Sequence, residues 1–174
     1  MTDIHVEKIT NSKLNVQITK KNFLYCFTFL SIFFLDRISK ILVIKEVEKN
    51  LNDKIFESSF INIELVWNEG IAFGLLSFSS TNIYNFVTVA VLAVILMVIY
   101  FFMKSQSLEK IFFLMILAGA TGNFYDRVAY EAVPDFIDLH INNFHWFIFN
   151  IADIFITLGV LCLILKEVLL KKND

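Results

Sequence analysis

The sequence predicts an all-α integral membrane protein, a four-transmembrane-helix bundle with a small extracytoplasmic β-sheet platform. Hydrophobic residues make up 57% of the 174 residues and charged residues only 18%, and the mean hydropathy is +0.66. A water-soluble domain has a more polar balance than this. Apolar runs of about 18 or more residues, enough to cross a hydrocarbon core of about 30 Å, recur along the chain.

Four stretches of the chain are expected to span the membrane: residues 23–44, 84–103, 111–130 and 147–170. Only the second reads as cleanly apolar, so we expect it to face lipid and to hold the bundle without doing chemistry. The other three stretches carry polar interruptions. Function is therefore expected to lie in those three.

The same pattern divides the chain into three parts. We expect residues 1–22 to form a mobile cytoplasmic arm, residues 23–170 the membrane domain, and residues 171–174 a cytoplasmic tail. Extracytoplasmic loops are predicted at about 45–81 and 130–146. Because a polar arm precedes the first apolar run and no small-residue cleavage pattern follows it, the first span is expected to act as an uncleaved anchor.

Lysine residues near the span ends predict the orientation, because cytoplasmic flanks carry an excess of Lys and Arg. Such residues flank both ends of the membrane domain and the short second connection: Lys13, Lys20, Lys21, Lys104, Lys110, Lys166, Lys171 and Lys172. The first long loop also carries lysines, but more acidic residues accompany them. The second long loop has neither Lys nor Arg. Both termini are therefore predicted to be cytoplasmic.

Cysteine and histidine give no metal signature by their spacing. Cys26 and Cys162 fall inside predicted spans and are expected to be packing residues, since a buried free Cys behaves as a small hydrophobe. His5, His140 and His145 form neither an HExxH motif nor an i, i+4 pair. We therefore expect no metal.

Acidic side chains are predicted to gather in one layer near the outer leaflet. At about 1.5 Å per residue, Asp36 lies about 20 Å along the first span and Asp126 about 23 Å along the third. Asp153 lies about 9 Å from the outer start of the fourth, oppositely directed span. Asp135 follows the third span and can fold back to the same depth. A charge at membrane depth costs about 2.5–3.5 kcal/mol on insertion scales, and it is usually paired with an opposite charge or lines a water-filled cavity.

Pairing separates these acids into two groups. Two have basic neighbours in sequence, which favours ion pairs that fix helix packing: Asp36 with Arg37 or Lys40, and Asp126 with Arg127. Asp135 and Asp153 have no basic neighbour. Two such carboxylates lying close together raise one pKa strongly, so that one stays protonated while the other is ionised. Aspartic hydrolysis needs this state.

The first long loop and Pro134 give further structural hints. Residues 60–67 (FINIELVW) alternate at period two, which predicts a strand and a small extracytoplasmic sheet. Trp67 and Trp146 fall at the expected outer interface, either as simple anchors or as part of a platform that clamps a peptide above the carboxylates. Pro134 disfavours a helical conformation just before Asp135, which either presents that carboxylate or only makes a turn.

Five motifs resemble those of the lipoprotein signal peptidase family, signal peptidase II, the aspartic peptidases of bacterial prolipoproteins. They occur in the family's order: residues 36–40 (DRISK), 68–74 (NEGIAFG), 122–127 (GNFYDR), 133–137 (VPDFI) and 149–153 (FNIAD). They are spread over about residues 36–157, so chance agreement of all five is very unlikely, and any one alone would be weak.

The resemblance implies roles for ten residues. Asp135 and Asp153 are similar to the catalytic pair of the family. The remaining positions match residues that line the family's active site or support it: Asn68, Gly70, Asn123, Arg127 and Asn150 as substrate-binding or dyad-holding residues, and Asp36, Lys40 and Asp126 as structural polar support. An asparagine in a span is otherwise a helix-to-helix hydrogen bond, and both readings stay open here.

This chain departs from the usual pattern at two places. Ala120 follows Gly119 where the family usually has two adjacent glycines, a small loss for close helix approach. Glu131 stands where a glycine is often found, which bears on the local turn more than on the chemistry.

The resemblance also implies the reaction and its setting. The expected substrate is a diacylglyceryl-modified prolipoprotein, cut on the amino side of its lipidated cysteine by a water that two aspartates activate. The expected place is the bacterial cytoplasmic (inner) membrane, with the active site near the outer leaflet. No cofactor and no nucleic acid is expected, a monomer is expected among membrane lipid, and inhibition by globomycin is implied.

Two rival classes explain the sequence less well. A carboxylate-based proton-coupled membrane carrier would string its acids across the bilayer, often within repeats. The acids here gather in one layer, and the sequence shows no internal repeat. A non-catalytic scaffold would tolerate Asp135→Asn and Asp153→Asn. Neither rival explains five ordered motifs.

Overall fold

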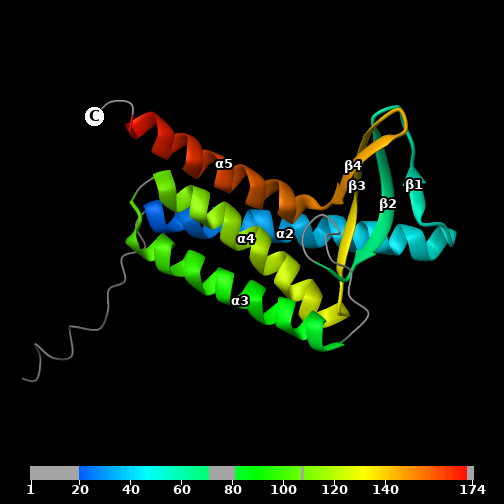
Figure 1. The fold of residues 1–174 in the computed structure, drawn as a ribbon, viewed down its shortest axis with the longest axis horizontal. Helices are drawn as coiled ribbons and strands as arrows, with labels where there is room; N and C mark the ends of the chain where they lie inside the picture. The colour runs from blue at the N-terminus through cyan, green and yellow to red at the C-terminus, as the bar shows by residue number, and fades with distance from the viewer. Residues whose placement is uncertain (1–19, 71–80, 107, 172–174) are drawn as a thin grey trace, which may run out of the picture.

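The computed structural model describes residues 20–70, 81–106 and 108–171. Its long helices are α2 (Lys20–Asn50), α3 (Thr81–Lys104), α4 (Leu108–Tyr130) and α5 (Ile151–Lys171). They form a bundle in which α4 packs against each of the other three (Figure 1). The mostly helical fold agrees with the helical part of the predicted class, and the four membrane spans stay a prediction.

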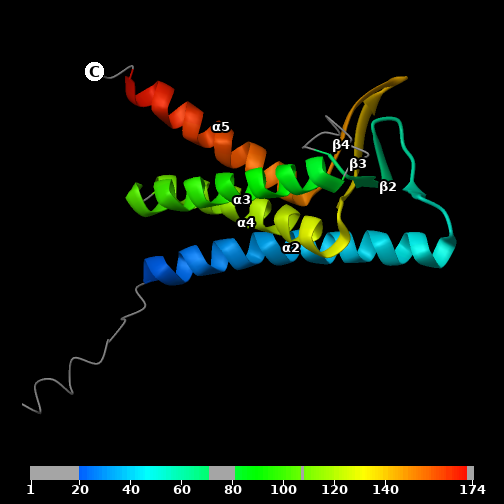
Figure 2. The same ribbon diagram turned by 60° about the horizontal axis from the view of Figure 1, so that its bottom comes forward.

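A small antiparallel sheet lies at one end of the bundle. Its strands follow the order β1 (Lys54–Phe56), β2 (Ile61–Asn68), β3 (Val133–Ile141) and β4 (Phe144–Phe149). Helix α2 extends past the other helices toward the sheet, as Figure 2 shows. The predicted strand at residues 60–67 is confirmed as β2, and the predicted small sheet is present.

Two predicted boundaries are wrong. The fourth span was expected from residue 147, but residues 144–149 form β4 and the helix begins at Ile151. An apolar run of this length does not distinguish a strand from a helix, and pairing with β3 decides it here. The first helix is also longer than expected, because it includes Lys20 and continues to Asn50. Residues 1–19 of the predicted arm lie outside the described residues.

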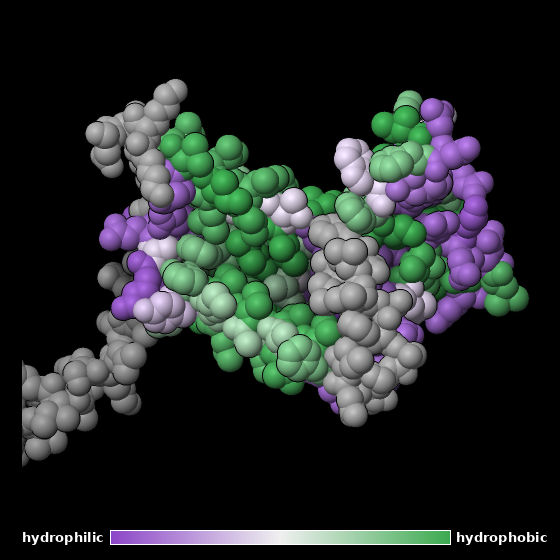
Figure 3. Space-filling model, in the orientation of Figure 1, coloured by the Kyte–Doolittle hydropathy of each residue, from purple (hydrophilic) through white to green (hydrophobic). Residues whose placement is uncertain are grey.

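Large apolar side chains are exposed along the helices. Figure 3 shows hydrophobic residues over the middle of the bundle and hydrophilic residues toward both ends of the molecule. Exposed examples come from three helices, among them Phe34, Phe86 and Leu165. Within the described residues, the segment Tyr84–Lys104 is long and apolar enough to cross a membrane, and most of its side chains are exposed. An exposed apolar surface of this kind marks contact with lipid or with another protein.

Glycines allow α4 to approach its neighbours closely. A Cβ on Gly119 would lie 2.6 Å from the carbonyl oxygen of Ala152 in α5. A Cβ on Gly122 would lie 2.6 Å from Oδ2 of Asp36 in α2. Both distances are shorter than a carbon-to-oxygen contact permits. These two glycines therefore let helix α4 pack closely against Asp36 of α2 and the start of α5.

Candidate active site

Asp153 lies in the first turn of α5 and caps that helix. The Asn150 side chain accepts a hydrogen bond from the backbone N–H of Asp153 (3.1 Å), and Oδ2 of Asp153 accepts one from the backbone N–H of Asn150 (3.2 Å). This reciprocal arrangement is a capping box, which satisfies two backbone donors at the start of a helix. The Asn-x-Ala-Asp motif therefore forms the start of helix α5. The same hydrogen bonds fix the position of the Asp153 carboxylate.

Asp135 lies in β3 and accepts hydrogen bonds from two asparagine amides. Asn68 Nδ2 donates to Oδ2 (2.8 Å) and Asn150 Nδ2 donates to Oδ1 (2.6 Å). A second hydrogen bond fixes the orientation of each amide. Asn68 Oδ1 accepts the backbone N–H of Gly70 (2.9 Å), and Asn150 Oδ1 accepts that of Asp153 (3.1 Å). Asn150 thus contacts both carboxylates and brings Asp135 and Asp153 into one site.

The two carboxylates are nearly inaccessible to solvent. Asp135 is 2% exposed and Asp153 8%. Burial raises the pKa of Asp135 to about 7, and repulsion by the nearby charge of Asp153 adds to that increase. The hydrogen bonds from Asn68 and Asn150 oppose it only in part. Asp135 is therefore able to keep a proton near neutral pH.

Asn123 of α4 connects Asp153 to a buried lysine. Its Nδ2 donates to Oδ1 of Asp153 (2.9 Å), and its Oδ1 accepts from Nζ of Lys40 in α2 (2.7 Å). Lys40 is 1% exposed and its two other donors go to carboxylates, Asp36 (2.9 Å) and Asp126 (2.8 Å). All three donors of the ammonium group are thereby used.

The ion cluster behind the site contains two acids and two bases. Arg37 pairs with Asp126 through both terminal nitrogens, at 2.5 and 2.6 Å, and lies 3.3 Å from Asp36. The second oxygen of Asp36 accepts the backbone N–H of Ala152 at the start of α5 (3.0 Å). Removing one member of such a buried cluster leaves an unpaired charge. The predicted pairing of Asp36 with Lys40 is confirmed.

The predicted pair of Asp126 with Arg127 is wrong. Successive residues on a helix point about 100° apart, so Asp126 faces the cluster while Arg127 turns elsewhere. Arg127 Nη2 donates to the carbonyl oxygen of Gly70 (2.7 Å). Its Nη1 is buried and has no hydrogen-bond partner among the described residues. The Arg127 carbonyl in turn accepts from the hydroxyl of Tyr84 in α3 (2.6 Å).

All ten residues singled out in the sequence lie in one connected hydrogen-bond and ion-pair network. It links Asp36 and Lys40 of α2, Asn123, Asp126 and Arg127 of α4, Asn68 and Gly70 of the β2 end, Asp135 of β3, and Asn150 and Asp153 at the start of α5. Two further members of the network were not predicted from the sequence. Arg37 was expected to pair only with Asp36, and Tyr84 belongs to the helix that was expected to face lipid and to hold the bundle without doing chemistry. Residues 71–74 of the second motif lie outside the described residues.

An apolar cavity of about 300 Å³ adjoins Asp153. It lies between the sheet and α5, and its walls include Leu139, Phe149, Thr157 and Leu158. Asp153 is also part of the lining. The site therefore joins a buried acid to a surface suited to apolar chains.

The fold and the site define a class, a helical membrane enzyme that buries a pair of carboxylates beside a cluster of ion pairs. Two solved structures share the fold, both described as "Bacterial membrane enzyme structure by the in meso method". The 2.3 Å structure has a TM-score of 0.73 and 28% identity and covers 87% of this chain and 91% of its own. The 1.9 Å structure has a TM-score of 0.67 and 29% identity, covering 83% and 92%.

Sequence relatives then specify the family. Residues 28–169 match the family described as Signal peptidase (SPase) II. The lipoprotein signal peptidase of Pelagibacter ubique (strain HTCC1062) is 47% identical over 152 residues, 87% of this chain and 92% of the relative. That of Francisella tularensis subsp. novicida (strain U112) is 45% identical over 122 residues, 67% and 75% of the two chains. The chain belongs to the signal peptidase II family, and these relatives give no support to the carrier alternative.

Proposed function

We propose that this chain is an intramembrane aspartic endopeptidase that removes the signal peptide from diacylglyceryl-modified prolipoproteins. The observation that carries the proposal is the buried pair of Asp135 and Asp153, bridged by Asn150. Family membership indicates the reaction class, and the relatives are named lipoprotein signal peptidases. Cleavage falls on the amino side of the lipidated cysteine.

The pair supplies both roles that peptide hydrolysis needs. One carboxylate takes a proton from water, whose oxygen attacks the scissile carbonyl carbon, while the protonated acid donates toward the developing oxyanion. The tetrahedral intermediate then collapses, the C–N bond breaks, and the leaving amine takes up a proton. The raised pKa of Asp135, about 7, supports a pair that holds one shared proton at rest.

Neighbouring polar groups position the peptide and the acids. Asn68, Asn123 and Asn150 hold the two carboxylates by amides of fixed orientation. Nη1 of Arg127 has no hydrogen-bond partner within residues 20–70, 81–106 and 108–171, and it is a donor suited to a substrate carbonyl, while Nη2 holds Gly70. Asp36, Lys40 and Asp126 are structural support rather than groups that touch substrate.

The exposed apolar surface of the bundle supports the proposed membrane placement. The four helices span the bacterial inner membrane, with the sheet and the carboxylates toward the outer leaflet. Lysines at the far end of the bundle support cytoplasmic termini, since Lys104 ends α3 and Lys166 lies near the end of α5. The enzyme acts as a monomer among lipid and binds globomycin. The apolar cavity beside Asp153 accepts an apolar part of the substrate.

Cleavage of a purified diacylglyceryl-prolipoprotein tests the proposal. The full chain in detergent is incubated with the lipidated precursor and with the same precursor lacking the diacylglyceryl group, and products are sequenced by mass spectrometry. We expect the lipidated precursor to be cut before its modified cysteine and the unmodified one to persist. Failure to cut a precursor that a known lipoprotein signal peptidase accepts would overturn the proposal.

A further inference from the structure

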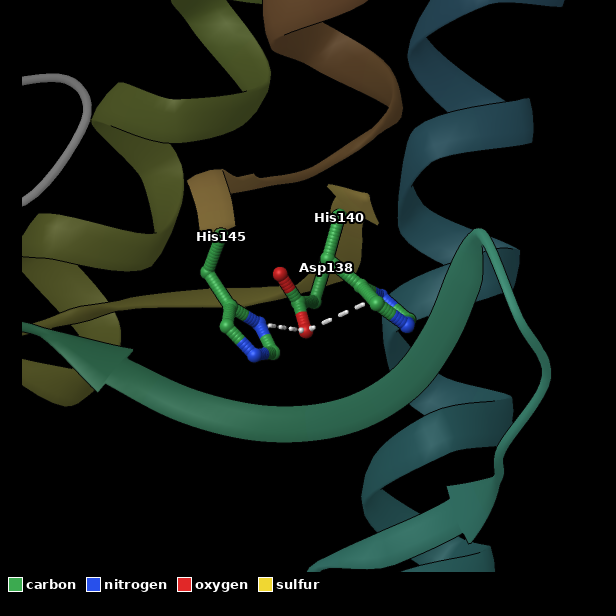
Figure 4. A group of neighbouring side chains, drawn as sticks. All are labelled: Asp138, His140 and His145. Atoms are coloured by element: carbon green, nitrogen blue, oxygen red, sulfur yellow. Dashed lines mark hydrogen bonds and ion pairs between the residues drawn. The ribbon is translucent and has the colours of Figure 1, made fainter. Parts of the chain in front are cut away.

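A second cluster of polar side chains lies outside the candidate active site, on strands β3 and β4. Asp138 and His140 belong to β3, and His145 of β4 is paired directly with His140. Asn62 of β2 is paired with Asp138 from the other side. Strand pairing therefore gathers residues from three strands, as Figure 4 shows for the acid and the two histidines.

The ring nitrogens of both histidines converge on one carboxylate. Nδ1 of His145 lies 2.7 Å from Oδ2 of Asp138, and Nδ1 of His140 lies 3.8 Å from the same oxygen. The two rings are stacked, with centroids 4.9 Å apart and planes 19° apart. One ligand atom from each residue falls within 4.8 Å of the others. A single ion at the centre of this group is within reach of all three.

Two atoms of the cluster are buried without a hydrogen-bond partner among the described residues. They are Nδ1 of His140 and Oδ1 of Asp138. The side chain of His140 is 10% exposed and that of Asp138 is 1% exposed. Leaving a buried polar atom unsatisfied costs about 1–3 kcal/mol. The His140 imidazole is aimed at the carboxylate but lies too far from Oδ2 for a hydrogen bond, and an ion between them would supply the missing partner of Nδ1.

We propose that Asp138, His140 and His145 bind a divalent transition-metal ion, with Zn²⁺ as the best match. Two imidazoles and one carboxylate are nitrogen-rich ligands that suit Zn²⁺, Cu²⁺ or Ni²⁺ rather than Mg²⁺ or Ca²⁺. Asn62 Nδ2 donates to Oδ2 of Asp138 (3.1 Å) and orients the carboxylate. Three protein ligands leave a further position for water.

The ion has a structural role, which is to stabilise the hairpin of β3 and β4. Strand β3 carries Asp135, and β4 leads directly into Asn150 and Asp153. The hairpin of β3 and β4 is thus the connection between the two carboxylates of the candidate active site. An ion held by both strands braces this hairpin without touching the reacting atoms. The absence of a metal motif in the sequence has a physical reason, because the ligands meet by strand pairing rather than by helical spacing.

Metal binding to the full chain tests this site directly. Untagged protein in detergent is stripped with a chelator and titrated with Co²⁺, whose visible absorption reports coordination by imidazole, and then with Zn²⁺ by calorimetry. We expect one ion per chain in the wild type. His145→Ala and the nearly isosteric Asp138→Asn are expected to weaken affinity at least about tenfold. His5→Ala, which alters a histidine outside the described residues, is the matched control and is expected to leave binding unchanged.

Thermal unfolding gives a second readout that does not depend on catalysis. Zn²⁺ is expected to raise the Tm of wild type and of His5→Ala but not of His145→Ala, because an ion that binds only the folded state stabilises it. The site is overturned if wild type binds no ion, in which case His145 shares only a proton with Asp138. It is equally overturned if folded Asp138→Asn and His145→Ala bind as wild type does.

Discussion

The side chains of Lys40 and Asn123 form a hydrogen bond of 2.7 Å, and this contact fixes which way the Asn123 amide points. A lysine ammonium only donates, so the amide oxygen must face Lys40. The amide nitrogen then faces Asp153, at 2.9 Å from Oδ1. The buried ion cluster therefore sets the orientation of a group that holds a carboxylate of the candidate active site.

Asn123→Ala tests this link. The variant removes the hydrogen bonds of the amide with Lys40 and with Asp153. Loss of the bond to the Asp153 carboxylate, worth about 1.5–3 kcal/mol, is expected to lower kcat/KM about 10- to 150-fold. The ion pairs of Lys40 with Asp36 and Asp126 remain, so the variant is expected to stay folded. Thr121→Ala on the same helix is the control. Steady-state cleavage kinetics check the prediction, and wild-type turnover by Asn123→Ala would count against a positioning role.

The raised pKa of Asp135 predicts how stability depends on pH. In an unfolded chain an aspartate titrates near pH 3.9, whereas the pKa of Asp135 in the folded protein is about 7. Between these values the native state binds more protons than the unfolded state, so the free energy of unfolding falls as pH rises. Asp135→Asn lacks this titration.

Thermal unfolding in detergent from about pH 4 to pH 8 checks the sign of this linkage. The Tm of wild type is expected to fall relative to that of Asp135→Asn as pH rises through this window, and Asp53→Asn, at an exposed position, serves as the control. Cleavage is expected to decline above about pH 7 as the shared proton is lost. Parallel Tm curves for wild type and Asp135→Asn would show that Asp135 is not the proton carrier.

Glu131 follows α4 with a φ of 56°, a left-handed conformation that favours glycine. For a residue with a Cβ this conformation costs about 1–2 kcal/mol. Glu131→Gly is therefore expected to raise the Tm by about 2–4 °C, while Glu131→Ala keeps the Cβ and is expected to give no such gain. Differential scanning of the three proteins distinguishes these outcomes. Equal Tm values for the Gly and Ala variants would remove strain as the explanation.

The apolar cavity predicts a substrate effect at Leu158. A tryptophan at this lining position would fill part of the roughly 300 Å³ space beside Asp153. Leu158→Trp is expected to lower kcat/KM for a lipidated precursor about tenfold or more, as misplacement near a reacting group does. Leu165→Trp, on the same helix and exposed, is the matched control. If both variants cleave equally well, the cavity does not receive substrate.

Much of the site was predictable because polar residues in apolar spans are costly and must meet one another. All ten predicted site residues lie in one network for that reason, although they come from three helices, two strands and the short segments beside them. The sequence could not show that Asp126 pairs with Arg37 instead of Arg127, since that choice depends on the rotation of α4 against α2. The role of Tyr84 was missed because one hydroxyl at a helix end gives little signal.

The boundaries of the fourth helix were less predictable. Residues 147–149 are apolar and aromatic, so they fit a membrane helix as well as a strand, and only their pairing with β3 decides between the two. The same pairing creates the cluster of Asp138, His140 and His145, which no spacing rule finds. Glu131 shows the opposite case, because the sequence pattern does carry a signal there. The family often has a glycine at this position, and the positive φ of Glu131 is a conformation that favours glycine.

The most direct test of the central claim is cleavage by the two aspartate variants. Asp135→Asn and Asp153→Asn are compared with wild type on a diacylglyceryl-prolipoprotein in detergent, after Tm and gel filtration show that each variant is folded. Removing either half of a carboxylate pair abolishes one of the two proton transfers, so both folded variants are expected to lose at least about 10²–10⁴-fold in turnover. Near-normal turnover by either folded variant would contradict the two-aspartate mechanism.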